Sequence, residues 1–332
     1  MRTIPCVWAA LVLLGCAQFD PRGVPGEMRD PERSDGGASQ PDANDSLVLP
    51  DAGMLVDGGA SQGCDLAAAL AADNLGAPQA IDAVNSSASD TNPFVTWDGM
   101  TLYFASTRGT GSFATDIWSI SRASTRGAFT GTPVLADDLG INSDDRERRV
   151  ALSQDGTILV VDRFPEIGGP GDLFTASRSD TDQPFGPLTG ISAINTGQDT
   201  ETNPWLSPDG LRLYYDSQSI VSGDSFIMVS QRVTVDDPFG TPTTVSLGAQ
   251  TDEVADPALT ADELVMFYRF RDDIWYATRT ATTESFTPGA ELTSVSSTSF
   301  DADPNLSPDG CELFFRSRRN GGQSDLFVSL VP

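Results

Sequence analysis

Four acidic stretches recur at comparable places along the chain, and their carboxylates are the groups best suited to chemistry. They comprise Asp144, Asp145, Glu147, Asp199, Glu201, Asp252, Glu253, Asp301 and Asp303. Each stretch precedes a predicted β-strand that opens a repeat. If the repeats close into a ring, these carboxylates would converge on one face, where they could hold Ca²⁺ or meet a basic partner. The same residues also suit solvated loops that have no further role.

The missing residue types exclude many reactions. The chain has no His, and all 20 of its basic residues are Arg. Mechanisms that use Ser-His-Asp or Cys-His groups, His-ligated metals and lysine nucleophiles are therefore excluded. Glycoside hydrolysis by two carboxylates needs neither residue type, but no Asp or Glu stands out in an apolar setting. The sequence therefore predicts no enzyme and no cofactor, with Ca²⁺ left open.

The charge balance limits the partners. A net charge of −27 argues against nucleic acid, because phosphate contacts need clustered Arg or Lys. It also disfavours adsorption to anionic membrane surfaces.

The N-terminus has the pattern of a signal for export. Arg2 precedes an apolar run that is too short to span a membrane and ends in Leu13-Leu14-Gly15-Cys16. This end resembles a bacterial lipobox, which predicts a lipoprotein signal peptide over residues 1–15 and a lipid on Cys16. Ala17 favours the outer membrane. The alternatives are an ordinary signal peptide or an uncleaved anchor.

Composition divides the rest of the chain. Residues 16–62 are rich in Pro, Gly and Asp with few large apolar residues, which predicts a disordered tether. Residues 63–332 form the predicted folded domain, with a short helix over residues 65–72. Two cysteines, Cys64 and Cys311, fall in this domain. In an exported chain they favour one disulfide, with two unpaired thiols as the alternative.

Five units repeat in this domain. Each reads as strand, tight turn, strand, loop and strand, and the turn aspartates lie 47 to 57 residues apart. Gly in these turns tolerates positive φ, so the turn residues are predicted to be structural. They are Asp98, Gly99, Asp155, Gly156, Asp209, Gly210, Asp262, Asp309 and Gly310.

This period predicts an all-β fold, a β-propeller of five four-stranded blades, with six left open. A short piece between units supplies each outer strand. The fifth unit ends at Pro332 without one, and a matching piece precedes the first unit at residues 76–84. That piece is predicted to complete the last blade and close the ring. A Cys64–Cys311 bridge would hold the closure.

The repeats resemble TolB-type WD40-like β-propeller repeats, also called PD40 repeats. The motif SPDG at residues 207–210 and 307–310, with DIW at 116–118 and 273–275, carries the resemblance. Unit two lacks the Pro pair, and unit four has Asp262-Glu263 in place of Asp-Gly. The resemblance implies a scaffold commonly used for protein binding in the periplasm.

These observations together predict an envelope-anchored, non-catalytic module that binds a protein or peptide partner. The membrane would be contacted through the lipid anchor only. Two alternatives remain: a carbohydrate- or Ca²⁺-binding module of lectin type, and a carboxylate-based glycosidase.

Overall fold

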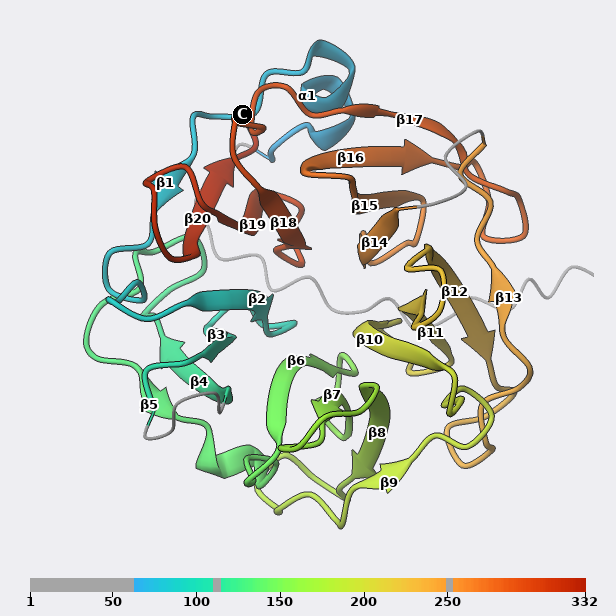
Figure 1. Cartoon of the computed structure of the whole chain (residues 1–332). Coiled ribbons are helices and arrows are strands. Elements are labelled where there is room, and N and C mark those ends of the chain that lie inside the picture. Colours follow the sequence, from blue (N-terminus) through green and yellow to red (C-terminus); the bar gives the residue numbers. More distant parts are fainter. Residues whose placement is uncertain (1–62, 110–114, 249–252) are drawn as a thin grey trace, which may run out of the picture. The chain divides into compact units, whose positions relative to one another are not determined.

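The computed structural model describes residues 63–109, 115–248 and 253–332. The predicted signal peptide, the predicted tether and Cys16 lie outside these residues. Within them, the strands form five sheets of four strands each, and Figure 1 shows the sheets arranged as blades around a central axis. The predicted five-bladed propeller is therefore confirmed. Neither helix in this part of the chain is long and apolar enough to cross a membrane.

Each blade is an antiparallel sheet whose four strands are arranged in order from the axis outward. Blade 1 comprises β2 (Asp90–Val95), β3 (Thr101–Ser106), β4 (Asp116–Ser121) and β5 (Val134–Leu135). The 3-10 helix η1 (Asp137–Leu139) leads to blade 2, with β6 (Arg146–Leu152), β7 (Ile158–Phe164), β8 (Asp172–Ser177) and β9 (Thr189–Gly190). Blade 3 comprises β10 (Asp199–Leu206), β11 (Arg212–Ser219), β12 (Ser225–Gln231) and β13 (Thr243–Thr244). Blade 4 comprises β14 (Val254–Leu259), β15 (Val265–Phe270), β16 (Asp273–Thr278) and β17 (Thr287–Glu291).

Blade 5 draws on both ends of the domain. It comprises β18 (Asp301–Leu306), β19 (Glu312–Ser317), β20 (Asp325–Leu330) and the N-terminal β1 (Gln79–Ala80). Strand β1 pairs with β20 as its outer neighbour, so the predicted closure is confirmed. The helix α1 (Leu66–Ala72) precedes β1, and Asp65 caps its first turn. Cys64 and Cys311 form a disulfide, with Cα atoms 5.5 Å apart.

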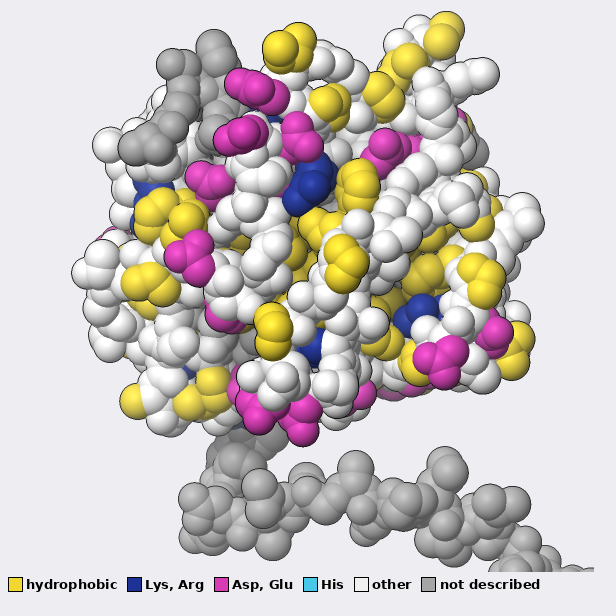
Figure 2. Space-filling model, turned by 90° about the horizontal axis from the view of Figure 1, so that it is seen from below, with side chains coloured by type: hydrophobic (Ala, Val, Ile, Leu, Met, Phe, Trp, Pro, Cys, Tyr) yellow, Lys and Arg dark blue, Asp and Glu magenta, His cyan; other side chains and the backbone are white. Residues whose placement is uncertain are grey.

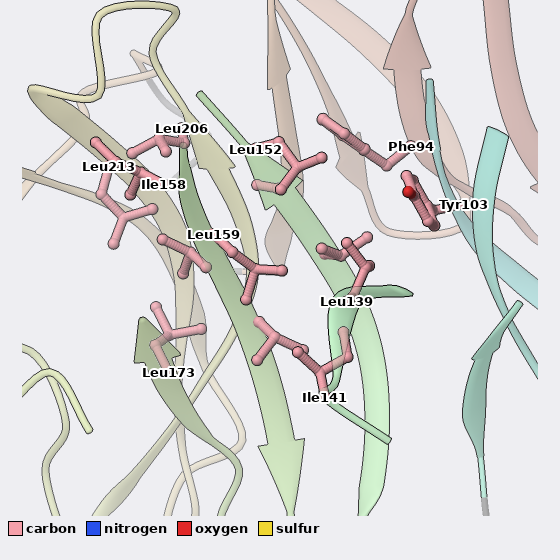
Figure 3. Close-up of a cluster of buried hydrophobic side chains, with 14 of the residues drawn as sticks. Phe94, Tyr103, Leu139, Ile141, Leu152, Ile158, Leu159, Leu173, Leu206 and Leu213 are labelled. Atoms are coloured by element: carbon pink, nitrogen blue, oxygen red, sulfur yellow. The ribbon is translucent and has the colours of Figure 1, made fainter. Parts of the chain in front are cut away.

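Apolar side chains fill the space between neighbouring blades. One cluster joins blades 1, 2 and 3, and Figure 3 shows Leu152, Leu159 and Leu213 among its members. The three central strands of a blade alternate between its two faces, so each blade presents apolar side chains to both neighbours. Stacking the blades in a ring therefore buries a core on every blade face.

The five tight turns use the same hydrogen bonds. In each, a Ser or Thr hydroxyl donates to the turn Asp at 2.6 Å. The same carboxylate accepts from the backbone N–H two residues later, at 2.9–3.1 Å. The residue after the Asp has positive φ in every turn, which Gly adopts freely and Glu263 adopts at φ 59°.

An arginine clasp stabilises four of the blades. Arg122, Arg178, Arg232 and Arg279 each donate from Nε to a carbonyl of the turn in the same blade, at 2.7–2.8 Å. Each guanidinium also covers a Phe seven residues later in the chain. Blade 5 has Val331 at this position, and its turn is joined to Cys64 through Cys311 instead.

Candidate binding site at the axis

The ring has two distinct faces. The inner strands β2, β6, β10, β14 and β18 begin on the first, which also carries the loops between the second and third strands of each blade. We call this the loop face. The inner strands end on the opposite face, which carries the five tight turns and is called the turn face.

The predicted acidic stretches lie on the loop face, but three of their carboxylates point into their own blades. Glu147, Glu201 and Asp301 are buried and accept hydrogen bonds from a Ser or Thr hydroxyl of the preceding loop, at 2.6–2.9 Å. Asp90 makes the same contact with Ser86 in blade 1. These carboxylates therefore hold loops in place instead of facing a shared ligand.

Arginines neutralise three of these four carboxylates. Arg108, Arg163 and Arg319 lie 2.6–2.8 Å from Asp90, Glu147 and Asp301. Glu201 forms no salt bridge with any described residue, and burial raises its pKa to about 7.

Of the remaining predicted residues, Asp303 is buried at the axis, where it accepts the Asn92 N–H. Asp144 and Glu253 are exposed, and Asp145 and Asp199 are partly exposed. Asp252 lies outside the described residues. No group of three or more His, Cys, Asp or Glu side chains in the described part could hold a metal ion. Ca²⁺ binding stays a prediction.

Five residues from the five inner strands meet at the axis. They occupy equivalent positions, and all are at least 95% buried: Asn92, Arg149, Asn203, Asp256 and Asp303. All except Arg149 have φ between 51° and 59°. The ladder between the first and second strands shifts register at each of these positions, which turns the backbone toward the axis.

Carboxylates satisfy the backbone N–H groups at this point. An inner strand has no neighbour on its axial side, so its N–H groups need other acceptors. Asp162 accepts from the N–H groups of Arg149 at 2.5 Å and Asn203 at 3.2 Å. Asp216 accepts from Asp256 at 2.7 Å, and Asp303 accepts from Asn92 at 3.1 Å.

Arginines of the second strands balance part of this charge. Arg269 lies 2.8 Å from Asp256, and Arg316 lies 2.8 Å from Asp303. Arg149 crosses the axis and donates to the carbonyl oxygen of Pro304 at 2.8 Å. The side chain of Arg149 therefore connects blade 2 with blade 5.

Two axial carboxyls have pKa values displaced in opposite directions. Burial and the nearby charge of Asp256 raise the pKa of Asp216 well above its usual range. At Asp256 burial acts in the same sense, but Arg269 and other arginines outweigh it and lower the pKa. Asn203 donates to both groups, at 2.8 and 2.7 Å. Asp216 is therefore the axial carboxyl most inclined to be protonated.

Two phenylalanines covered by arginines lie on the loop face, Phe164 at the end of β7 and Phe300 just before β18. The guanidinium carbons of Arg146 and Arg148 both lie 5.2 Å from the centre of Phe164. Three arginines cover Phe300 at 4.9–5.6 Å: Arg269, Arg316 and Arg318. We call these five arginines and Arg149 the arginine mouth.

Several groups of the arginine mouth lack partners. Among the described residues, buried Nε and Nη1 of Arg149 and Nε of Arg146 have no hydrogen-bond partner. Arg148 makes no hydrogen bond or salt bridge through its guanidinium to that part of the chain. Its charge nevertheless opposes the rise that burial causes in the pKa of Asp162. The buried nitrogens of Arg146 and Arg149 therefore lack an acceptor in the described part of the chain.

The turn face closes the other end of the axis. Trp97 and Trp205 meet edge to face with ring centroids 6.3 Å apart, and Trp97 donates to the Leu152 carbonyl at 2.7 Å. The cavity beside them has a volume of only about 10 Å³. A ligand of the axis would therefore enter from the loop face.

Sequence reasoning named Asp303 but missed the other axial residues and their partners on the second strands. Their signal is an ionisable residue at one register position of an otherwise apolar second strand: Asp162, Asp216, Arg269 and Arg316, with Ala105 in blade 1. Comparison of the units at this position would have found them.

Comparison with known proteins supports the fold. No family model and no curated protein matches the sequence. Among solved structures, α-L-arabinofuranosidase from Lactobacillus brevis is 12% identical with a TM-score of 0.51, covering 76% of this chain and 94% of that one. TolB from Acinetobacter baumannii is 15% identical with a TM-score of 0.46, and the match covers 74% of this chain and 56% of that one. Putative TolB from Agrobacterium tumefaciens is 16% identical with a TM-score of 0.44, covering 78% and 92%. The neighbours of this propeller thus include TolB-like proteins.

One prediction is corrected by this comparison. The chain was predicted not to be an enzyme, yet the arabinofuranosidase has the same propeller fold. The prediction rested on the lack of His and Lys and on finding no Asp or Glu in an apolar setting, but Asp162, Asp216 and Asp256 are buried at the axis. Glycoside hydrolysis uses two carboxylates and requires neither residue type.

Proposed function

We propose that this propeller is a binding module that captures an anionic ligand in the arginine mouth. The observation that carries the proposal is the set of buried guanidinium nitrogens without a partner in the described part of the chain, Nε of Arg146 and Nε and Nη1 of Arg149. The partly buried Arg148 lies beside them over Phe164. Buried donors without acceptors cost free energy, and an anion would remove that cost. Arg guanidinium groups bind carboxylate and phosphate oxygens in a bidentate manner.

The crowding of like charge supports the same function. Burial lowers the pKa of Arg316, and the charges of Asp303 and Asp256 oppose this effect. The nearby charges of Arg148 and Arg269 add smaller contributions that lower it further. A chain with a net charge of −27 has concentrated arginines at this one point. The side of the ring in Figure 2, by contrast, displays many carboxylates and few basic groups. The surrounding negative charge would repel weak anions, so the site would select a ligand able to contact several arginines.

The location proposed for this module is the cell envelope. The lipobox-like LLGC at residues 13–16 supports a lipid on Cys16 and an outer-membrane anchor, with residues 16–62 as the tether. The ligand would then belong to an envelope protein or peptide. Mass spectrometry of the envelope-extracted protein tests this part through the mass of its N-terminal residue.

Calorimetric titration with citrate tests the binding function. Wild-type protein should bind citrate with an affinity that falls as salt rises, because the contacts are ionic. Arg148→Gln should weaken binding about tenfold or more, since an ionic hydrogen bond contributes about 1.5–3 kcal/mol. Arg126→Gln is the matched control: it removes the same charge on the turn face, where Arg126 pairs with Asp309 at 2.7 Å. Equal affinity in all three proteins would refute the proposal.

Glycoside hydrolysis is the second candidate. It is favoured by the opposite pKa displacements of Asp216 and Asp256, which resemble the division between an acid and a base. Against it, Asp216 accepts a backbone N–H and is 3% exposed. Hydrolysis of an aryl arabinofuranoside that disappears in Asp216→Asn would favour this candidate over simple binding.

A further inference from the structure

The loop face carries exposed aliphatic side chains beside the arginine mouth. Ile167 is 86% exposed in the loop between β7 and β8, while Ile220 and Val221 are 59% and 90% exposed in the loop between β11 and β12. These loops belong to the adjacent blades 2 and 3. We call the three residues the aliphatic rim.

The aliphatic rim lies on the same face as the arginine mouth, in the loops of blades 2 and 3. Ile167 follows Phe164, the ring that Arg146 and Arg148 cover, by three residues. The corresponding loops of blades 4 and 5 are polar. The first consists of Arg271 and Asp272, and the second, at residues 318–324, contains only polar residues and Gly. The loop face therefore offers cations at its centre and aliphatic groups toward blades 2 and 3.

We infer that the ligand is a polypeptide segment in which carboxylates alternate with aliphatic side chains. This inference rests on the proposed anion binding. Carboxylates would contact the arginine mouth, and neighbouring aliphatic groups would cover the aliphatic rim. In an extended segment successive side chains point to opposite sides, which allows both contacts at once. Burial of the rim contributes about 25 cal/mol for each Å² of apolar surface removed from water.

Other anions fit the loop face less well. A small inorganic anion or a polycarboxylate sugar has no aliphatic surface to cover the rim. An anionic bilayer offers apolar surface, but Glu166 precedes Ile167 and its backbone N–H bonds to the Asp145 carboxylate at 3.0 Å. These carboxylates, in a chain of net charge −27, oppose insertion of the loop between β7 and β8 into an anionic membrane. The combination of charge and aliphatic groups thus points to a protein partner.

The test compares two peptides by fluorescence anisotropy on the full chain: an octapeptide of alternating Glu and Leu, and octaglutamate. Wild type should bind the alternating peptide about tenfold more tightly, a difference of about 1.4 kcal/mol. Ile167→Ser with Val221→Ser should abolish this preference and leave octaglutamate affinity unchanged. Arg148→Gln should weaken both peptides. Val233→Ser is the control, because Val233 is 85% exposed beyond β12 on the turn face.

The outcomes separate the inference from the function on which it rests. Equal wild-type affinity for the two peptides, or a preference that survives the double rim variant, overturns the inference while the anion site stands. Rim-dependent binding to phosphatidylglycerol vesicles without peptide binding also overturns it, in favour of lipid. If neither peptide binds and Arg148→Gln changes no titration, both the inference and the anion site fail.

Discussion

The tight turns use the same residue type in all five blades, whereas the equivalent positions at the axis differ from blade to blade. Every turn has an Asp that accepts from the same two donors, at nearly the same distances in all five blades. The equivalent axial positions instead hold Asn, Arg, Asn, Asp and Asp. Each turn carboxylate is held by donors of its own turn, so the five identical side chains do not depend on one another. At the axis five side chains meet, and five equal charges would repel each other.

This difference gives a rule for interpreting the repeat. A residue type that recurs in every blade satisfies the blade itself, as Asp98 and Asp209 satisfy their turns. A position at which the blades differ is shaped by the assembled ring or by a ligand. Four predictions test the rule, and they are arranged from the largest expected effect to the smallest.

Asp162→Ala should destabilise the domain most. Asp162 is fully buried and accepts three backbone N–H groups, so its removal leaves all three without this acceptor. It also removes a carboxylate that interacts with the charge of Arg148. We expect the free energy of unfolding to fall by roughly 3–5 kcal/mol, as when one partner of a buried charged pair is removed. Urea denaturation measures the change. A loss below that of a turn variant would contradict the rule.

Removing the disulfide should have the next largest effect. Cys64→Ser with Cys311→Ser opens the closure of blade 5, whose third strand lacks the arginine clasp of the other blades. The expected loss is roughly 2–5 kcal/mol, typical of a native disulfide in an exported domain. Arg178→Gln, which removes the clasp of blade 2, is the comparison and should cost less. Thermal unfolding with and without reductant provides the readout.

These two sites also show how far the sequence was informative. The ring closure could be predicted because β1 resembles the outer strands of other blades and Cys64 lies beside it. The contacts at the axis could not be predicted, because residues such as Arg149 and Pro304 come from blades 2 and 5 and meet only once the ring is closed. The sequence also did not show which way the side chains of the predicted acidic residues point. Alternation along a strand allows Glu147 to face either the axis or its own blade. The hydrogen bond from Ser143 in the preceding loop holds it toward its own blade.

Glu201→Gln should stabilise the domain in a pH-dependent way. At this position blades 1, 2 and 5 pair a carboxylate with Arg, but Glu201 has no such partner among the described residues. Burial raises its pKa from 4.5 to about 7. Glu201 therefore ionises at a lower pH in the unfolded chain than in the folded domain. As a result, the wild type loses stability as pH rises from about 4.5 to 7. The Gln variant should match wild type near pH 4 and exceed it by about 1–2 kcal/mol at pH 8, given that one pKa unit corresponds to about 1.4 kcal/mol. Asp301→Asn, which leaves Arg319 unpaired, should destabilise at pH 8; stabilisation by both variants would contradict the argument.

Asp209→Ala should have the smallest effect, because it breaks one blade's turn and leaves the ring unchanged. Asp209 accepts from Ser207 Oγ at 2.6 Å and from the Leu211 N–H at 3.0 Å. Hydrogen bonds of this kind contribute about 0.5–1.5 kcal/mol each, and partial exposure places the total near the lower end. Burial alone would raise the pKa of Asp209, but these bonds outweigh it and lower the pKa. The wild-type advantage should therefore be present above about pH 4, the ordinary range for Asp, and be lost as pH falls through the lowered folded pKa. Asp209→Asn keeps the acceptor and should recover most of the stability without the pH dependence.

Peptide and citrate affinity should stay unchanged in both variants, because the turn lies on the face opposite the arginine mouth. A change in affinity would mean that a repeated turn position also serves the site, against the rule.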